Sequence, residues 1–502
     1  MSYAKLVLTL SFPFRTRRLL VPEGPPVVDR KARFKIPAQV MPKQDPAVRM
    51  HNWDETNLPI DLATARIEAE RCIQCPAAPC TKACPVENDI PGAFWLLEHG
   101  DVIGAADKFR ETSSLPEMCG RLCPQERLCE GHCVVGKNAK PVAIGRLEVF
   151  VTDYQREKSG FPTPEMAPAS GRKVAIVGAG PAGLAAAEEV AVRGHRATVF
   201  DAWPEPGGIL LYGIPNFKLA KRILDQKTDF LRKQGVEFVM NTRVGKDVTL
   251  EDLFAEGYEA VFLGHGASIG NLLDIEGYDL TGVYMATDFL VRGNLKPTQL
   301  PEGQRQPLRV GKRVLIIGGG DTSMDCVRTA VRLDAQEVRC MYRRTEAEMP
   351  GRAEERVHAR DEGVIIEFLV APVRFFGDEG GRVTAVEFRR MQLGEPDESG
   401  RRRPVPIEGS EFIVEAETVV LALGYTVDRT FSETVPGLEA DRRGRIVTDR
   451  ETGRTNIPGV FAGGDSVNGA DLVVTAVRDG RRAAGGIDEY LRSLPPKQAA
   501  SK

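Results

Sequence analysis

The sequence contains no apolar run as long as a membrane-spanning helix, which needs about 20 residues. It also lacks an excess of positive charge, because 67 Lys and Arg residues against 70 Asp and Glu residues give a net charge of -3. A nucleic-acid-binding protein usually shows a basic balance, so we expect neither a membrane nor a nucleic acid as partner. The opening residues 1–20 hold an apolar stretch, but basic residues follow it and no small-residue cleavage site comes next. We interpret them as the start of an ordered N-terminal arm.

The length of 502 residues is too great for one hydrophobic core, and three domains are the natural expectation. Prolines are scattered through residues 1–60 and periodicity is weak, so this segment cannot build a core of its own. We expect an N-terminal arm that wraps over a neighbouring domain or reaches a partner subunit.

Eight of the ten cysteines lie between residues 72 and 133, in two groups of four. The groups are Cys72, Cys75, Cys80 and Cys84, then Cys119, Cys123, Cys129 and Cys133. Thiols this dense indicate metal binding, a disulfide framework or reactive chemistry. Zinc sites favour paired CxxC motifs, whereas these spacings are uneven and a proline follows the first group, as in bacterial ferredoxins. Two iron–sulfur clusters fit best, and a cytoplasmic location agrees with thiols that stay reduced.

Three helical patterns accompany these cysteines, at residues 61–72, 91–112 and 141–160. They predict a small helical domain over residues 61–165, built around metal. Residues 161–171, with three prolines and a glycine, are typical of a linker.

A dinucleotide-binding turn is predicted after the linker. Residues 174–177 read as a strand, Gly178, Gly180 and Gly183 form GxGxxG, an alanine-rich helix follows, and a second strand ends at Asp201. The glycines permit a tight turn and let a pyrophosphate approach the helix N-terminus. An acidic residue after the second strand accepts hydrogen bonds from ribose hydroxyls. This context favours FAD or NAD(H) over an ordinary tight turn.

A second copy of the pattern has a different chemistry. Residues 314–317 read as its first strand, Gly318 and Gly320 hold the first two glycine positions, and Ser323 replaces the third. The second strand, residues 338–342, ends in Arg343 and Arg344. Guanidinium groups bind a 2′-phosphate bidentately where a carboxylate would repel it, so the second site suits NADP(H). The alternative is that both arginines are a solvated strand end.

The C-terminal part is interpreted as a return to the first of these domains. Residues 416–425 read as an apolar strand, and residues 459–484 as strand, turn and helix with Asp465 at the turn. That carboxylate can accept a hydrogen bond from a ribityl hydroxyl of a flavin, and the following helix N-terminus would favour anionic reduced flavin. The alternative role for Asp465 is a helix cap.

Two other classes compete with an electron-transfer flavoprotein. A dithiol reductase of the thioredoxin reductase kind needs a cysteine pair near the flavin, but Cys326 and Cys340 are 14 residues apart with no CxxC. Both are better interpreted as small buried residues. A regulatory scaffold has no use for the intact glycine turns and their charged partners, so it too is disfavoured.

Eight motifs together resemble the small (beta) subunit of bacterial NADPH-dependent glutamate synthase. Its relatives are the N-terminal half of dihydropyrimidine dehydrogenase and the large subunit of ferredoxin:NADP transhydrogenase. The motifs are CIQCPAAPCTKACP, CGRLCPQERLCEGHC, VAIGRLE, GAGPAGL, GGILLYGIPNFKL, GGGDTSMDCVR, YRRTEAEMPG and FAGGDSVNGADLVVTA, over roughly residues 65–490.

The resemblance implies an α/β fold of tandem Rossmann-type domains behind the helical iron–sulfur domain. A FAD domain would take residues 171–290 and 415–495, with an NADPH domain inserted at 291–414. It also implies two [4Fe–4S] clusters, one held by Cys72, Cys75, Cys80 and Cys133, the other by Cys84, Cys123, Cys129 and Glu148. Cys119 would be a spectator, and Glu148 as an ordinary helix-surface carboxylate is the alternative.

The expected cofactor-binding residues fall into two sets, and no acid–base catalytic residue is expected, because the cofactors carry the hydride chemistry. The FAD set is Gly178, Gly180, Pro181, Ala182, Gly183, Asp201, Gly208, Gly464, Asp465, Thr475 and Ala476; the NADPH set is Gly318, Gly320, Asp321, Thr322, Ser323, Arg343 and Arg344.

The resemblance implies an oxidoreductase subunit that oxidises NADPH through FAD and passes electrons through the clusters to a large redox subunit. A glutamate synthase alpha-type partner, serving glutamate biosynthesis, is expected first. A ferredoxin or flavoprotein partner, as in the transhydrogenase, is the alternative, because residues up to about 57 match no motif of the family.

Overall fold

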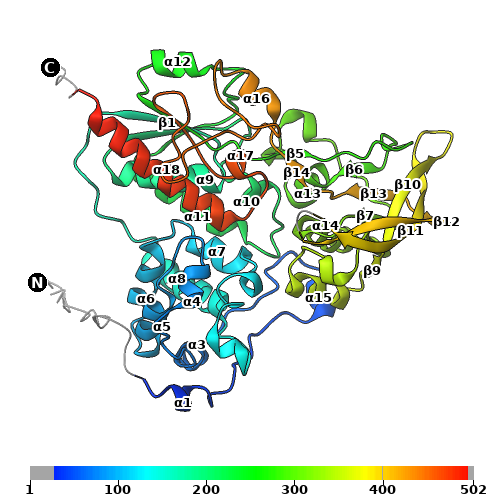
Figure 1. The fold of residues 1–502 in the computed structure, drawn as a ribbon, viewed down its shortest axis with the longest axis horizontal. Helices are drawn as coiled ribbons and strands as arrows, with labels where there is room; N and C mark the ends of the chain where they lie inside the picture. The colour runs from blue at the N-terminus through cyan, green and yellow to red at the C-terminus, as the bar shows by residue number, and fades with distance from the viewer. Residues whose placement is uncertain (1–27, 398–399, 496–502) are drawn as a thin grey trace, which may run out of the picture.

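The computed structural model describes residues 28–397 and 400–495, which fold into a helical domain and two Rossmann-type units (Figure 1). The predicted start of the N-terminal arm, residues 1–20, lies outside the described residues. No helix in the described ranges is long and apolar enough to cross a membrane.

The helical domain packs five longer helices around the cysteine segments. These are α3 (Leu62–Glu70), α5 (Ile90–Glu98), α6 (Val102–Arg110), α7 (Pro116–Leu122) and α8 (Ile144–Ser159), with short α1 (Arg30–Arg33), α4 (Pro79–Ala83), η1 (Gln125–Arg127) and η2 (Val134–Lys137). Short α2 (Pro46–Arg49) lies outside this domain, against the second Rossmann unit. Aspartates at positions 61, 89 and 101 cap α3, α5 and α6 through their side chains. The single pattern predicted over residues 91–112 is two helices, because Gly100 adopts a φ of 91° between them.

The first Rossmann unit is a parallel sheet of order β15-β4-β1-β2-β3. Its strands are β1 (Lys173–Val177), β2 (Arg196–Phe200), β3 (Glu237–Val239), β4 (Ala260–Leu263) and β15 (Val460–Ala462). Its helices are α9 (Pro181–Val192), α10 (Ile209–Tyr212), α11 (Lys221–Lys233), α12 (Leu250–Ala255), α16 (Arg429–Glu433), α17 (Asp465–Asn468) and α18 (Val473–Ser493).

The second Rossmann unit is a parallel sheet of order β6-β13-β7-β8-β9. Its strands are β6 (Val283–Met285), β7 (Arg313–Ile317), β8 (Glu337–Tyr342), β9 (Ile365–Phe368) and β13 (Thr418–Leu421), with α13 (Ala286–Asn294), α14 (Asp321–Arg332), α15 (Ala353–Asp361), η3 (Pro297–Gln299), η4 (Glu302–Gln304) and η5 (Glu346–Glu348). An antiparallel sheet of β10 (Val370–Gly377), β11 (Val383–Pro396) and β12 (Arg402–Glu415) lies beside it, at the right of Figure 1. Strands β5 (Ile269–Gly270) and β14 (Tyr425–Thr426) pair where the chain passes between the two units.

The insertion of the second unit within the first is as predicted, but its edges differ from the predicted boundaries. Strands β6 and β13 were assigned to the first unit, whereas β13 pairs with both β6 and β7 in the second sheet. The nested unit therefore begins before residue 291 and extends beyond residue 414. A fully buried parallel strand such as β13 reads as a plain apolar run, and that pattern cannot tell which sheet will accept it.

Residues 43–56, here called the strap, run from the helical domain to the second Rossmann unit. Arg49, only 2% exposed, donates to Glu362 at 2.8 Å, and Arg328 and Arg332 of α14 donate to the same carboxylate at 2.8 and 2.7 Å. Burial opposes ionisation of Glu362, but the Arg332 and Arg328 guanidiniums outweigh it and lower the pKa of Glu362 to about 2. The expected arm thus contacts this chain's own second unit through a buried ion network.

Candidate redox cofactor sites

The first glycine turn is held by contacts that leave no room for side chains. Gly178 adopts a φ of 101°, and a Cβ at Gly183 would lie 1.8 Å from the Gly178 carbonyl oxygen. Asp201, at the end of β2, accepts hydrogen bonds from the Ala179 N–H at 2.7 Å and the Trp203 N–H at 2.9 Å. The carboxylate therefore braces the turn at the edge where a dinucleotide binds.

The other predicted FAD-binding residues gather around this turn. A Cβ on Gly208 would lie 2.7 Å from the Gly180 Cα, and one on Gly464 would lie 2.9 Å from the Ala182 Cβ and 3.5 Å from the Ala476 Cβ. Pro181 begins α9, and the Thr475 hydroxyl donates to the Leu472 carbonyl at the start of α18.

Asp465 follows β15 and is the most perturbed carboxyl of this site. Burial, with the neighbouring Asp471 carboxylate, raises the pKa of Asp465 to about 7. A hydroxyl donor placed against it would favour the charged form.

The second glycine turn has the same plan with one larger residue. A Cβ on Gly318 would meet the Ala422 carbonyl oxygen at 2.2 Å, and Ser323 donates its hydroxyl to that oxygen at 3.5 Å. Asp321 accepts the Arg352 N–H at 2.9 Å, and the Gly351 N–H donates to the Gly319 carbonyl at 3.0 Å. The loop before α15 therefore closes over this turn. Next to it, Thr322 interacts with the Tyr425 hydroxyl.

Arg343 and Arg344, predicted as a pair, occupy different environments. Arg343 is exposed, and no ion pair holds its guanidinium among the described residues. Arg344 is 4% exposed and donates to the Asp397 carboxylate at 2.6 Å and to the Arg402 carbonyl at 2.7 Å. Only Arg343 is therefore left with its charge unpaired at the end of β8.

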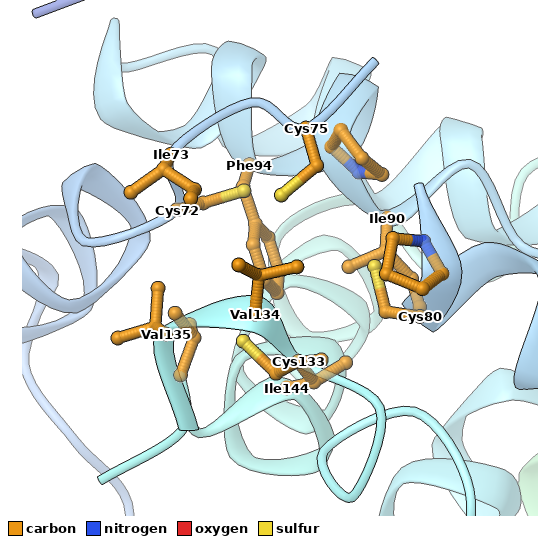
Figure 2. Close-up of a pocket in the computed structure, with 13 residues that line it drawn as sticks. Cys72, Ile73, Cys75, Cys80, Ile90, Phe94, Cys133, Val134, Val135 and Ile144 are labelled. Carbon is orange, nitrogen blue, oxygen red and sulfur yellow. The ribbon is translucent and has the colours of Figure 1, made fainter. Parts of the chain in front are cut away.

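Four cysteines of the helical domain line one pocket, with apolar side chains between them (Figure 2). They are Cys72, Cys75, Cys80 and Cys133, the set implied by the family resemblance rather than by the spacing. Burial raises the pKa of Cys80 to about 11, with Cys133 adding to the effect. Closely placed neutral thiols of this kind ionise when they bind a cationic metal centre.

The four thiols that line this pocket equal in number the protein ligands of one [4Fe–4S] cluster. A [4Fe–4S] cluster takes one thiolate at each iron, so its ligands line a cavity instead of meeting at a point.

Two arginines that the sequence analysis missed hold the first part of this pocket. Arg30 donates to the Ile73 and Gln74 carbonyls at 3.2 and 3.3 Å, and Arg33 donates to the Cys72 carbonyl at 2.7 Å. The Asp29 cap and the basic run after it were the available signal, but neither indicates a contact with residues about forty positions away.

Most of the remaining cysteines lie where the helical domain packs against the first Rossmann unit, but Cys129 packs in the core of the helical domain. Cys84, Cys119 and Cys123 pack into the same apolar cluster as the core of that unit, whereas the first set packs into the core of the helical domain. Glu148 is 6% exposed and accepts the Asn88 amide at 3.3 Å. Burial first, and then Cys119, raise its pKa well above the usual range. Burial also raises the pKa of Cys129, and the Glu130 and Glu148 carboxylates add to that effect.

Cys326 and Cys340 are fully buried in the second unit, and Cys340 donates its thiol to the Gly318 carbonyl at 3.3 Å. Burial raises the pKa of Cys340 to about 12. Both therefore lie away from the first glycine turn as small core residues.

Comparison with known proteins identifies the family. Residues 172–480 match the family described as pyridine nucleotide-disulphide oxidoreductase, and residues 49–160 match dihydropyrimidine dehydrogenase domain II, 4Fe-4S cluster. The chain is 41% identical to the glutamate synthase [NADPH] small chain of Escherichia coli K12, over 90% of this chain and 96% of that one. The chain belongs to the glutamate synthase small-chain family. The predicted resemblance is confirmed.

Other relatives of this family differ in length. The putative oxidoreductase UacF of Escherichia coli K12 is 42% identical over 94% of this chain and 73% of its own length. The NADP(+)-dependent formate dehydrogenase subunit beta of Moorella thermoacetica is 40% identical over 83% of this chain and 60% of its own. The solved structure of Mycobacterium tuberculosis FprA with NADPH shares the fold, with a TM-score of 0.53 and 22% identity over 64% of this chain and 84% of that one.

The small-chain family membership confirms the predicted fold class, tandem Rossmann-type units behind an iron–sulfur domain. The protein is an NADPH-dependent oxidoreductase that uses FAD and 4Fe-4S iron–sulfur chemistry.

Proposed function

We propose that this chain is the NADPH-oxidising subunit of a glutamate synthase and that it carries two [4Fe–4S] clusters in its helical domain. When bound, FAD supplies hydride acceptance and the clusters supply one-electron transfer. The observation that supports this most is the division of the cysteines. One set lines a pocket in the core of the helical domain. In the other, Cys84 and Cys123 pack against the core of the first Rossmann unit, while Cys129 packs in the helical core and is close enough to Glu148 and Cys84 for both to raise its pKa.

Each proposed role falls to residues with a fitting environment. The first glycine turn, with Asp201, Gly208 and Asp465, holds FAD, and the second, with Asp321 and Arg343, holds NADPH. Cys72, Cys75, Cys80 and Cys133 hold one cluster; Cys84, Cys123, Cys129 and Glu148 hold the other. A carboxylate ligand is harder than a thiolate and changes the charge and potential of its cluster.

The first experiment measures iron and flavin in anaerobically purified protein. We expect eight irons per FAD, the content of two [4Fe–4S] clusters, and bleaching of the flavin absorbance by NADPH. Cys75→Ser should remove one cluster signal from the electron paramagnetic resonance spectrum and Cys123→Ser the other, while Cys326→Ser, the matched control, keeps both. Four irons per FAD in the parent protein, or loss of both cluster signals in each single variant, would contradict the two-site assignment.

A large glutamate synthase subunit is the proposed partner. The chain covers 96–97% of the length of three glutamate synthase small chains but 60% of the formate dehydrogenase subunit. We also propose a cytoplasmic location, where thiol ligands stay reduced. The test is to purify the protein from its native cell under anaerobic conditions and assay NADPH-, glutamine- and 2-oxoglutarate-dependent glutamate formation. Copurification of a different flavoprotein alone, without this activity, would overturn the choice of partner.

A further inference from the structure

The chain crosses between the two Rossmann units twice. It enters the second unit after β4 and leaves it after β13, and the strands β5 and β14, of two residues each, pair at this crossing (Figure 1). Domains joined in this way move relative to one another unless a further interface holds them. Hydride transfer from NADPH to FAD, however, requires the reacting atoms to lie within about 3.5 Å of each other. A further contact therefore has to fix the separation of the two nucleotide sites.

Residues 213–220, here called the α10–α11 loop, connect the first nucleotide site to α14 of the second unit. The loop follows α10, which starts after Gly208, the residue packed against Gly180 of the first glycine turn. Helix α14 starts at the second glycine turn. The Lys218 ammonium of the loop donates to the Asp325 carboxylate of α14 at 2.8 Å, and both side chains are 8% exposed. The position of this loop on α14 therefore determines how far apart the two turns lie.

The strap contacts both sides of this junction. Its Trp53 carbonyl accepts the Asn216 amide of the loop at 2.7 Å, and its Thr56 N–H donates to the Phe217 carbonyl at 2.9 Å. The Thr56 hydroxyl accepts a hydrogen bond from Arg328 of α14 at 2.6 Å. Thr56 therefore contacts the loop with its main chain and α14 with its side chain.

Phe217 of the loop is enclosed by the same cations that contact the strap. Its ring is 1% exposed, and the guanidiniums of Arg328 and Arg332 lie 4.4 and 4.1 Å from the ring centroid. Arg332 also donates to the main-chain carbonyls of Arg49 and Asn52, at 2.8 Å in each case. Cation–π contacts gain strength when they are removed from water. The loop, the strap and α14 therefore share one buried cluster.

The strap is also bonded to the helical domain, so it does not move with one Rossmann unit alone. The Glu55 carboxylate accepts the Arg121 guanidinium of α7 at 2.5 Å, and it accepts the Ala220 N–H of the α10–α11 loop at 3.3 Å. Arg121 in turn pairs with Asp153 of α8 at 2.6 Å. The three parts of the molecule therefore meet at residues 49–56.

We propose that the strap is a positioning element, which holds the α10–α11 loop against α14 so that NADPH and FAD face each other at the separation that hydride transfer needs. The transfer breaks a C–H bond of the nicotinamide, and the hydride carries its electron pair to the flavin, so NADPH becomes NADP+ and the flavin is reduced. The strap acts through the loop and α14 rather than on either cofactor. This role is independent of the number of clusters and of the partner subunit.

The test measures flavin reduction by saturating NADPH in anaerobic holoenzyme, followed by stopped-flow absorbance. Asn216→Asp replaces the amide that donates to the strap but keeps the oxygen that accepts the Lys221 N–H. Thr56→Val removes the hydroxyl that Arg328 contacts. We expect the Asn216→Asp/Thr56→Val variant to reduce its flavin at least about tenfold more slowly, with the Kd of NADPH within about threefold and the flavin content unchanged. Thr56→Ser, which keeps the hydroxyl, should retain the rate of the parent protein.

Arg49→Met tests the buried end of the strap. Removing one partner of a buried ion network destabilises a protein strongly, so Lys227→Met is the matched control. Lys227 is 1% exposed and pairs with Glu188 at 2.7 Å inside the first Rossmann unit. We expect both variants to unfold at a lower temperature. Arg49→Met alone should slow flavin reduction about tenfold or more, and it should weaken the long-wavelength absorbance that a nicotinamide stacked on a flavin produces.

Two results would overturn the proposal. One is a flavin reduction rate in the Asn216→Asp/Thr56→Val variant that equals the rate of the parent protein, whether or not Arg49→Met folds. The other is an equal slowing in Lys227→Met, which would mean that stability, and not the orientation of the two units, governs the rate.

Discussion

The two glycine turns share one strand–turn–helix plan and differ at two positions. In the first turn Gly183 packs its Cα against the Gly178 carbonyl, whereas Ser323 fits at the equivalent place in the second and bonds to the Ala422 carbonyl. The first turn ends its second strand with Asp201, the second with Arg343. The size of the residue at the third glycine position therefore indicates how closely the helix approaches the strand. The charge of the residue at the end of the second strand indicates whether the bound ribose carries a 2′-phosphate.

The largest expected effect comes from filling the tighter turn. Gly183→Val would place a branched side chain where even a Cβ meets main-chain oxygen at 1.8 Å, so the backbone must move. We expect purified protein with less than about a tenth of its FAD, measured from the ratio of flavin to protein absorbance. Full flavin content in this variant would show that the two turns do not differ in packing.

The second-largest effect is expected from giving the end of the second strand in the second turn the charge found in the first turn. Arg343→Asp gives the second turn the acid of the first, and a carboxylate there repels a 2′-phosphate while accepting ribose hydroxyls. We expect the ratio of kcat/KM for NADPH to that for NADH to fall by about 100-fold or more. The measurement is steady-state reduction of menadione with each cofactor. An equal loss for both cofactors would mean that Arg343 does not distinguish the two riboses.

A pH dependence should distinguish the first turn from the second. Without FAD, the raised pKa of about 7 keeps Asp465 protonated in the folded chain, while the unfolded chain ionises near 3.8. Its contribution to stability is therefore full at low pH and is lost as pH rises toward 7. A donating ribityl hydroxyl favours the carboxylate, so FAD binding releases a proton and tightens with rising pH up to about 7.

The measurement is the Kd of FAD for flavin-stripped, full-length protein between pH 5.5 and 7.5. We expect the Kd to fall by up to about tenfold for each pH unit below the pKa of Asp465. Asp465→Asn should bind FAD more weakly and with no slope. A parent protein with a flat profile would exclude Asp465 as the titrating ligand.

The smallest effect is expected at the looser turn. Ser323→Ala removes one long hydrogen bond, that to the Ala422 carbonyl, and leaves a side chain that fits. The loss of stability should stay below about 1 kcal/mol, with the Kd of NADPH within about threefold. Thermal unfolding and fluorescence titration measure both. If Ser323→Ala lost NADPH binding as fully as Gly183→Val is expected to lose FAD, the two turns would not differ in how tightly they are packed.

The sequence was sufficient for features that depend on local pattern. Both glycine turns, their flanking strands and the helices that deliver the cysteines follow from short-range periodicity and steric demands. The cysteine sets do not follow from local pattern, because the spacing of the cysteines does not indicate that Cys133 groups with Cys72, Cys75 and Cys80. That grouping came from the family resemblance, and in the structure these four cysteines line one pocket.

The features that sequence reasoning missed depend on partners far along the chain. From the sequence, Arg344 is predicted to bind the 2′-phosphate, but in the structure it pairs with Asp397, 53 positions away. The strap reads as irregular chain, yet Arg49 is buried against Glu362 across 313 positions. Strand β13 was placed in the wrong sheet because burial on both faces erases the alternation of polar and apolar residues. Strand β6 is a partly buried edge strand of three residues, too short to show such an alternation.

Because one Rossmann unit is nested inside the other, the inner unit can be completed before the outer one as the chain is synthesised. All strands of the second sheet are complete once β13 has been made, whereas β15 of the first sheet is made later and must find β4 across the finished insert. Chains fold from the N-terminus as they emerge, so the inner unit can mature while the outer one still lacks an edge strand and α18. Nascent chains arrested before Val460 should therefore protect the inner unit from protease and fail to retain flavin.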